Sequence, residues 1–392
     1  MDAPVSTPPE TGIRFFRPFL PLFGTIFFCL LSVGASLATL PFYVTDELGG
    51  GDLAVGVVVA TIAVAAIVAR PIAGRLADRR GYKPILLAGA VACSAAGALY
   101  YASLHVAVLI PVRLLHGVGE AAVYTAGAAW LVAISPPARR GRVVGLYGIA
   151  MWLGITLGAL AGELLRDGIG FGAVWAFCAL APLVGLALAA RTRGPDQAGG
   201  AAKPVLVPRG AVVPGVALSL ASLGYGALAA FVALHMDAKG LAGGIAAFNA
   251  YGFAYVGVRL VLGNWPDRFG PRRVAFWSGL VEAGGLLLVA AAPNLTVAVL
   301  GGLVMGAGLS LLFPSLALIV INQTPPTQQG GAIGTFTSFW DLGVALGGPL
   351  GGIIVGISDY PQIFYVMMVA AVASAGLGAL PIRRPVGATA SG

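Results

Sequence analysis

Twelve apolar segments, each close to the length needed to cross a lipid bilayer, follow one another along this 392-residue chain. A bilayer-spanning helix needs about 20 predominantly apolar residues. Short polar or Pro- and Gly-containing breaks separate the segments, which cover residues 18–44, 53–75, 84–103, 107–133, 143–165, 170–190, 211–235, 242–263, 273–292, 295–320, 329–356 and 361–381. We therefore expect an all-α membrane protein with twelve transmembrane helices.

The composition indicates that lipid, rather than water, is the main solvent of this chain. Charged residues make up 10% of it, against about 25% in soluble domains. Cys29, Cys93 and Cys178 lie far apart inside apolar runs, so we interpret them as small core residues and expect no disulfide, metal or cofactor. The first apolar run follows Arg14 and Arg17 and is too long for the core of a signal peptide, which favours a retained first span.

The basic residues predict the orientation, because short cytoplasmic loops are enriched in Lys and Arg. With a cytoplasmic N-terminus, eighteen basic residues fall in cytoplasmic segments, and only Arg166 and Lys239 fall in outer loops. Both termini are thus predicted to be cytoplasmic in a multi-pass protein of the plasma (inner) membrane. The same distribution explains the net charge of +8 as a topology signal, so we expect no nucleic-acid partner.

A repeat with a constant offset of 189 residues runs through the chain. The stretch "ARPIAGRLADRRGYKP" (69–84) aligns without gaps with "VRLVLGNWPDRFGPRR" (258–273). The pairs include Arg70 with Arg259, Asp78 with Asp267, and Arg79 with Arg268. Two homologous halves in the same orientation are predicted: a six-helix bundle over 1–190, a Pro- and Gly-rich cytoplasmic linker over 191–210, and a second six-helix bundle over 211–392.

Three short motifs resemble those of the major facilitator superfamily, and the likeness covers essentially the whole chain. They are "GRLADRRGYKP" (74–84), "RLLHGVGEA" (113–121) and "GITLGALAG" (154–162). Tyr82, His116 and Ala159 stand where the family pattern has Arg, Gln and Pro. Within the superfamily the chain looks like the twelve-span proton-coupled drug and metabolite exporters. The resemblance implies the fold of two pseudo-symmetric bundles and transport by alternating access.

Asp78 is an acid in a loop otherwise selected for basic residues. The resemblance implies that Asp78 helps to latch the two halves in the outward-open state, near the cytoplasmic end of span 11, whereas capping of the turn is the alternative. The predicted gating residues are Arg70, Asp78, Arg79, Gly81, Lys83 and Asp341. Their predicted echo in the second half consists of Arg259, Asp267 and Arg268.

Span 4 carries four polar side chains on one face, since a helix turns 100° per residue. These are Arg113, His116, Glu120 and Tyr124. A charge at the centre of a span costs about 2.5–3.5 kcal/mol on translocon-based scales, so this face should line a cavity or pair internally. We predict a site for protons or substrate with Glu120 as the proton carrier, and the alternative is a buried structural ion pair.

Small residues at four-residue spacing predict close helix packing in both halves. They are Gly154, Gly158 and Gly162 in span 5, and Gly347 and Gly351 in span 11. A bending role during alternation is a second hypothesis for the same stripes.

Two further features bear on the interior of the molecule. Glu282 lies in the middle of span 9, where we expect a structural partner. Aromatic and polar side chains of spans 1, 7 and 8 are candidate pocket residues: Phe27, Phe28, Tyr43, Tyr225, Phe231, Asn249, Tyr251 and Tyr255. An aromatic lining suits apolar or amphipathic substrates, although aromatic side chains also pack in membrane cores.

These observations predict a secondary active transporter of the plasma membrane. It exports a small organic compound, drug-like and apolar or amphipathic, in exchange for protons; the alternative is proton-coupled uptake of a sugar or an organic acid. An enzyme is not expected, because no nucleophile–base pair or metal cluster is found at the span ends. The expected partners are a small-molecule substrate, protons and the lipid bilayer, and the chain is expected to be a monomer.

Overall fold

The computed structural model describes residues 17–136, 139–192, 209–325 and 328–380. Within them, twelve helices are long and apolar enough to cross a membrane, which confirms the predicted number of spans. The first half comprises α2 (Leu20–Phe42) with its π-helical extension η1 (Tyr43–Glu47), α3 (Asp52–Arg80), α4 (Tyr82–Leu99) with the short η2 (Tyr100–Ala102), α5 (Val106–Ile134), α6 (Arg140–Gly168) and α7 (Phe171–Arg191). The second half comprises α8 (Arg209–Asp237), α9 (Ile245–Leu262), the short α10 (Trp265–Phe269), α11 (Pro271–Ala291), α12 (Leu295–Gln323), α13 (Gln329–Ile357) and α14 (Tyr360–Ala379).

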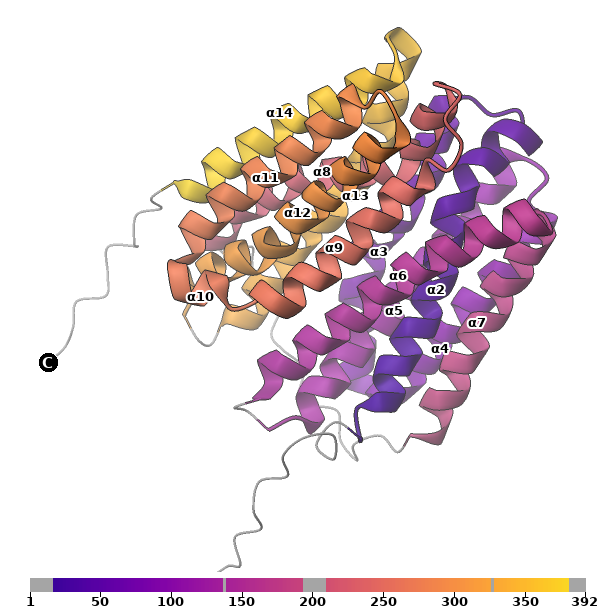
Figure 1. Cartoon of the computed structure of the whole chain (residues 1–392). Helices are drawn as coiled ribbons and strands as arrows, with labels where there is room; N and C mark the ends of the chain where they lie inside the picture. Colours follow the sequence, from indigo (N-terminus) through magenta and orange to yellow (C-terminus); the bar gives the residue numbers. More distant parts are fainter. Residues whose placement is uncertain (1–16, 137–138, 193–208, 326–327, 381–392) are drawn as a thin grey trace, which may run out of the picture.

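The two halves use the same helix pairs. In the first half α2 packs on α6 and α7, α3 on α5, and α4 on α5 and α7. In the second half α8 packs on α13 and α14, α9 on α12, and α11 on α12 and α14. Figure 1 shows the halves as two bundles inclined to each other. The fold is thus an all-α membrane fold, as the sequence predicts.

The 189-residue offset reappears in the packing. A Cβ atom on Gly117 would meet the carbonyl oxygen of Ile62, and one on Gly306 would meet that of Tyr251, which is 189 positions further along. These glycines allow the helix backbones to approach more closely than any larger side chain would permit. The 189-residue repeat in the sequence is therefore accompanied by a repeat of helix–helix contacts.

The first helix of each half departs from this offset. Gly154 packs on the backbone of Phe27, whereas its counterpart Gly343 packs on that of Ser219, and Phe27 and Ser219 are 192 positions apart. The chain between the first and second helices is consequently three residues shorter in the second half.

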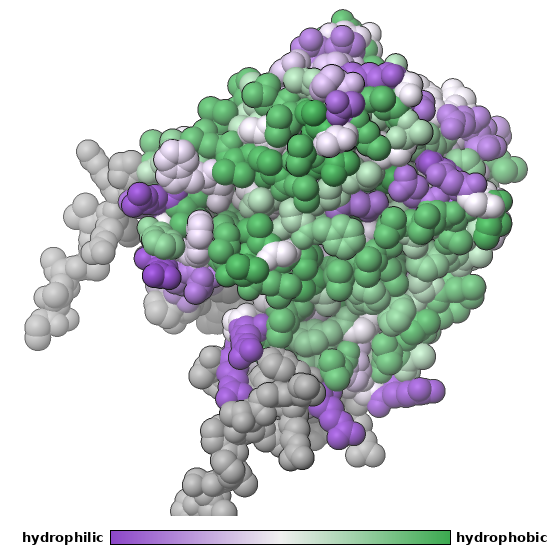
Figure 2. Space-filling view, viewed as in Figure 1, coloured by the Kyte–Doolittle hydropathy of each residue, from purple (hydrophilic) through white to green (hydrophobic). Residues whose placement is uncertain are grey.

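One end of the molecule carries most of the basic side chains, and we call it the basic end. It is the end at which α2 begins and α14 ends. Its described members include Arg17, Arg75, Arg79, Arg80, Lys83, Arg139, Arg140, Arg142, Arg191, Arg268, Arg272 and Arg273. Figure 2 shows a broad apolar surface with polar side chains gathered toward its ends, as a bilayer requires.

The halves are in close contact at the opposite end. There, Gly56 of α3 packs on the backbone of Gly348 of α13. The hydroxyl of Tyr360 donates a hydrogen bond to Asp52 Oδ1 at 2.6 Å, which also joins the two halves. In Figure 1 the bundles meet at the upper right and separate toward the lower left, where α10 lies.

Candidate functional site

A cavity of about 1090 Å³ lies between the two halves. Its walls come from α2, α3, α5 and α6 on one side and from α8, α9, α12 and α13 on the other. It reaches the basic end, where Arg142, Asn264 and Ile333 line it. Gly56 and Gly348 seal the other end. Among the described residues, the cavity is therefore accessible from the basic end.

A group of four residues, the Arg70 cluster, bridges the halves in the cavity wall: Arg70, Glu120, Tyr124 and Asp341. Arg70 Nη2 lies 3.3 Å from Glu120 Oε1, and Arg70 Nε lies 2.9 Å from Asp341 Oδ2. The guanidinium carbon is also 4.6 Å from the centroid of the Tyr124 ring, a cation–π distance. The cluster forms because α3 packs along α5 in its own half and along α13 of the other.

Arg70 and Asp341 belong to the predicted gating residues. In the structure they bind each other, nearly three turns before the end of α3. A part in gating for this pair stays a prediction. The partner that the structure gives Glu120 is Arg70 rather than Arg113.

The polar face of α5 is divided between two environments. Glu120 and Tyr124 line the cavity, but Arg113 and His116 are fully buried inside the first half and do not line it. Arg113 donates hydrogen bonds to the carbonyls of Val58 and Val59, so its charge is solvated by the backbone of α3.

His116 and Arg113 share the hydroxyl of Tyr100. Arg113 Nη1 donates to Tyr100 Oη at 3.3 Å and to Ser36 Oγ at 3.1 Å. His116 Nδ1 lies 2.9 Å from the same tyrosine oxygen, and its Nε2 lies 3.3 Å from Ser32 Oγ. These contacts join α5 to α2 and η2, which is an internal arrangement. A part in proton coupling for Arg113 and His116 remains a prediction.

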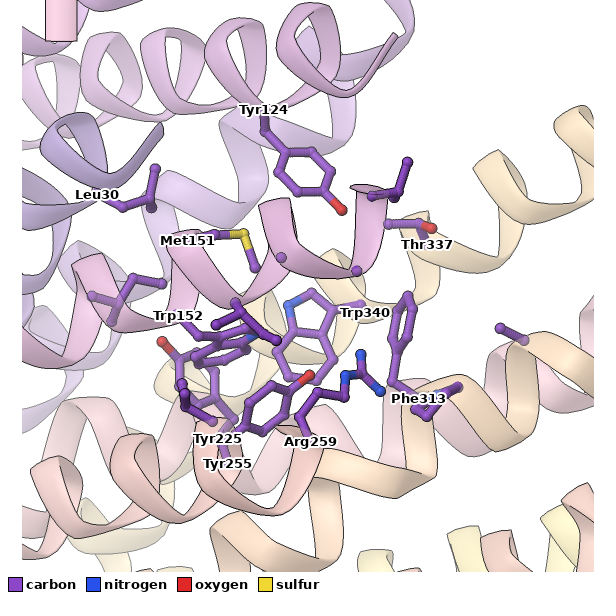
Figure 3. Close-up of a pocket in the computed structure, with 18 of the residues that line it drawn as sticks. Leu30, Tyr124, Met151, Trp152, Tyr225, Tyr255, Arg259, Phe313, Thr337 and Trp340 are labelled. Carbon is purple, nitrogen blue, oxygen red and sulfur yellow. The ribbon is translucent and has the colours of Figure 1, made fainter. Parts of the chain in front are cut away.

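Aromatic side chains from both halves form the middle of the cavity wall. The centroid of the Trp152 ring lies 4.3 Å from that of Tyr255 and 5.9 Å from that of Trp340. Tyr225 lies 5.3 Å from Trp152 and 5.6 Å from Trp340. Figure 3 shows these rings gathered around one space, with Arg259 beside Tyr255. We call Trp152, Tyr225, Tyr255 and Trp340 the aromatic wall.

Of the predicted pocket residues, Tyr225 and Tyr255 line the cavity, whereas Phe27, Phe28, Tyr43, Phe231 and Asn249 do not. Sequence reasoning missed Trp152 and Trp340. The repeat contained a signal for Trp152. Asp341, a predicted site residue, lies 189 positions after Trp152, so the two residues occupy equivalent positions of the two halves. Tyr251, a further predicted tyrosine, is fully buried behind the wall, with its ring 5.9 Å from Trp152.

The residues of the predicted gating loop lie where α3 ends and α4 begins. Asp78 and Arg79 are in the last turn of α3, and neither joins a salt bridge among the described residues. Gly81 has φ +90°, a conformation that separates the two helices and that other residues rarely adopt. Lys83 donates to the carbonyls of Ala190 and Thr192 at 2.7 and 2.9 Å, so it caps the end of α7.

In the second half, the predicted echo residues lie in α9 and α10. Arg259 and Asp267 line the cavity. Arg259 Nη1 donates to the carbonyl of Ser310 at 2.9 Å. The guanidinium of Arg268 lies 5.3 Å from the ring of Phe269.

The predicted glycine stripes lie at helix contacts. A Cβ atom on Gly154, Gly158 or Gly162 would overlap the backbone of α2. One on Gly347 would overlap the backbone of α8, and one on Gly351 would overlap the ring of Phe231 on the same helix. This geometry supports the packing interpretation of both stripes.

Glu282, for which a structural partner is predicted, has no such partner among the described residues. It is fully buried in α11, and neither carboxyl oxygen has a hydrogen-bond partner in the described part of the chain. The Cβ of an alanine at Gly224 would lie 3.4 Å from Glu282 Oε1, which places the carboxyl group toward α8.

Comparison with known proteins agrees with this architecture. The family model of the Major Facilitator Superfamily matches residues 22–247 and 215–392. An MFS-type transporter of Salmonella typhimurium is 31% identical over 395 residues, covering 97% of this chain and all of the relative. One of Burkholderia mallei is 31% identical over 376 residues, covering 93% of this chain and 92% of the relative.

Solved structures share the fold. The crystal structure of the nucleoside transporter NupG superposes with a TM-score of 0.75 at 14% identity, covering 92% of this chain and 98% of the other. A human organic anion transporter gives a TM-score of 0.68 at 18% identity, covering 95% of this chain and 100% of the other. The chain therefore belongs to the major facilitator superfamily and is a multi-pass membrane transporter, not an enzyme.

Proposed function

We propose that this protein is a proton-coupled exporter of small amphipathic organic compounds in the plasma membrane, working by alternating access. The observation that carries the proposal is a cavity between two halves that, among the described residues, opens toward the basic end, with an ion cluster that bridges the halves in its wall. Such a cavity exposes a central site to one side of the membrane at a time.

The distribution of Lys and Arg supports placing the basic end in the cytoplasm. On that orientation, the conformation described here is inward-open and receives substrate from the cytoplasm. Parting of Gly56 from Gly348 and closure at the basic end would then release it outside.

Charge counting in the Arg70 cluster supports proton coupling. With both carboxylates ionised, the single cation Arg70 faces Glu120 and Asp341, and the cluster has a net charge of −1. One proton makes it neutral, which favours its transfer into a less hydrated environment. Because Asp341 belongs to the second half and Arg70 to the first, a proton on Asp341 weakens a bond between the halves. Proton binding is thereby connected to their relative movement.

Transport in proteoliposomes with an imposed pH gradient tests this proposal. A panel of labelled amphipathic compounds is first screened for exchange across the membrane, and the gradient is then applied in either direction. For an exporter that exchanges substrate for protons, we expect the labelled compound to accumulate on the acidic side of the membrane. Accumulation on the alkaline side, together with the entering protons, would instead support a symporter.

Two variants locate the coupling site. We expect Asp341→Asn and Glu120→Gln to abolish the response to the pH gradient while exchange without a gradient persists, because neither amide can exchange a proton. Glu47→Gln, which changes an exposed acid outside the cavity, is the matched control and should respond like the wild type. A full gradient response in both cluster variants would refute the assignment.

A further inference from the structure

We propose that Arg259 and the aromatic wall bind the anionic group and the flat apolar body of an organic anion. The proposal concerns the substrate class of the same cavity and so rests on the transporter function proposed above. Three observations carry it: the different surroundings of two equivalent arginines, the position of Arg259, and the rings beside it.

Arg70 and Arg259 occupy equivalent positions of the repeat but have different neighbours. Arg70 is paired with carboxylates on both sides. In the described part of the chain, Arg259 has no carboxylate within salt-bridge distance, and Asp267, the acid nearest to it in the sequence, does not pair with it.

The repeat identifies the positions from which acids would neutralise Arg259. The residue 189 positions after Glu120 is Leu309, and the residue 189 positions before Asp341 is Trp152. Both acidic positions of the Arg70 cluster are therefore apolar around Arg259. Arg259 is thus a cation without the two counter-charges that surround its equivalent, Arg70.

Arg259 is held at the cavity surface. Nη1 donates to the Ser310 carbonyl at 2.9 Å, which anchors the side chain along α12. The residue is half-buried and lines the cavity, and its guanidinium carbon is 5.8 Å from the centroid of the Tyr255 ring. A partly desolvated cation fixed in this way favours an anionic ligand, because guanidinium forms strong, directional bonds with carboxylate and phosphate groups.

The aromatic wall provides an apolar surface next to this cation. The rings of Trp152 and Tyr255 pack against each other at 4.3 Å, and Figure 3 shows Phe313 on the other side of Arg259. Since flat apolar groups stack well on such rings, a ligand with a carboxylate and a fused aromatic body would contact both features at once.

Binding of 2-naphthoate to the purified full-length protein tests the proposal without requiring transport. Tryptophan fluorescence reports occupancy, because two of the wall residues are tryptophans. We expect 2-naphthoate to bind at least about tenfold more tightly than its neutral isostere 2-naphthamide, since only the acid can form a charged pair with Arg259.

Variants assign this preference to Arg259. Arg259→Gln should remove the difference between the two ligands while 2-naphthamide binds as before, and Arg259→Lys should restore part of it. Arg272→Gln removes the same charge at an exposed position outside the cavity and should keep the wild-type preference, which also controls for folding.

The outcomes separate this inference from the proposed function. No preference for the acid over the amide in the wild type, or a preference that survives Arg259→Gln, overturns the anion site whatever the transport assays give. A preference that depends on Arg259 supports the site, even where no pH-driven transport is found.

Discussion

A side chain larger than hydrogen at Gly56 should open the end of the molecule that is closed in this structure. Gly56 lies on α3, and a Cβ atom there would overlap the carbonyl group of Gly348 on α13 of the other half. The obstacle is backbone, which cannot move aside as a flexible side chain can. The strain of Gly56→Ala therefore falls on the contact between the halves and disappears when they separate.

The size of the effect follows from the cost of overpacking. Inserting a methyl group into a tight contact costs about 1–3 kcal/mol, and about 1.4 kcal/mol changes an equilibrium constant tenfold. Gly56→Ala should thus shift the ratio of the two conformations about 5- to 150-fold toward the one in which these ends are apart. Gly56→Val, with more volume, should shift it further.

Cysteine labelling measures the shift. Leu37 lines the cavity and is 6% exposed, so a Leu37→Cys reporter is shielded from a membrane-impermeant maleimide added at the closed end. In the Gly56→Ala background the labelling rate should rise in proportion to the open population. Lys239→Cys, at an exposed position of the closed end, shows that the reagent reaches this side of the membrane.

A glycine on the same helix is the matched control. A Cβ atom on Gly74 would lie 3.7 Å from Thr125, an ordinary van der Waals distance, so Gly74→Ala should leave Leu37→Cys shielded. Gly348→Ala approaches the same contact from the other half and should reproduce the effect of Gly56→Ala. Unchanged labelling in both folded variants at the contact would refute the reasoning.

Three further substitutions test individual polar groups. Tyr360→Phe removes the hydrogen bond to Asp52 across the closed end, which contributes about 1.5–3 kcal/mol when one partner is charged, and should increase labelling of Leu37→Cys about tenfold or more; labelling at the wild-type rate would contradict this. Arg113→Met removes an arginine with four internal hydrogen bonds and should lower the free energy of unfolding by about 3 kcal/mol, measured by thermal denaturation, whereas lost gradient-driven transport at unchanged stability would favour a coupling role instead. Glu282→Met should raise the melting temperature, corresponding to about 1 kcal/mol, because it removes two buried oxygens that have no partner among the described residues; a lower melting temperature would reveal a partner for that carboxyl group.

The number of helices could be predicted from the sequence because each span must be long and apolar to cross lipid. This property belongs to one continuous stretch of residues and needs no knowledge of tertiary contacts. The similarity of the two halves could also be predicted from the sequence, since Gly, Asp and Arg recur at matching positions with a constant, ungapped offset. The three-residue shift of the first helix of each half could not be predicted from the sequence, because α2 and α8 share no comparable motif. Their register is set by the packing of Gly154 and Gly343 against them.

The site was harder to predict, because its contacts join helices far apart in the chain. Helical angles placed Arg113 and Glu120 on one face of α5, but helical periodicity does not reveal which other helices pack against that face. The direction of Arg113 is decided by the carbonyls of Val58 and Val59 on α3. Arg70 and Asp341 were found as separate charges, and only the crossing of α3 and α13 unites them.

The presence of Trp152 and Asp341 at equivalent positions makes each half depend on the other. A protein made of two first halves would have tryptophan at both positions, so neither copy of Arg70 would find an acid across the interface. A protein made of two second halves would keep the acid but lose the tryptophan, and its arginines would lack the acid that Glu120 supplies from the first half. The two halves use the same helix pairs, yet neither could replace the other in this cluster.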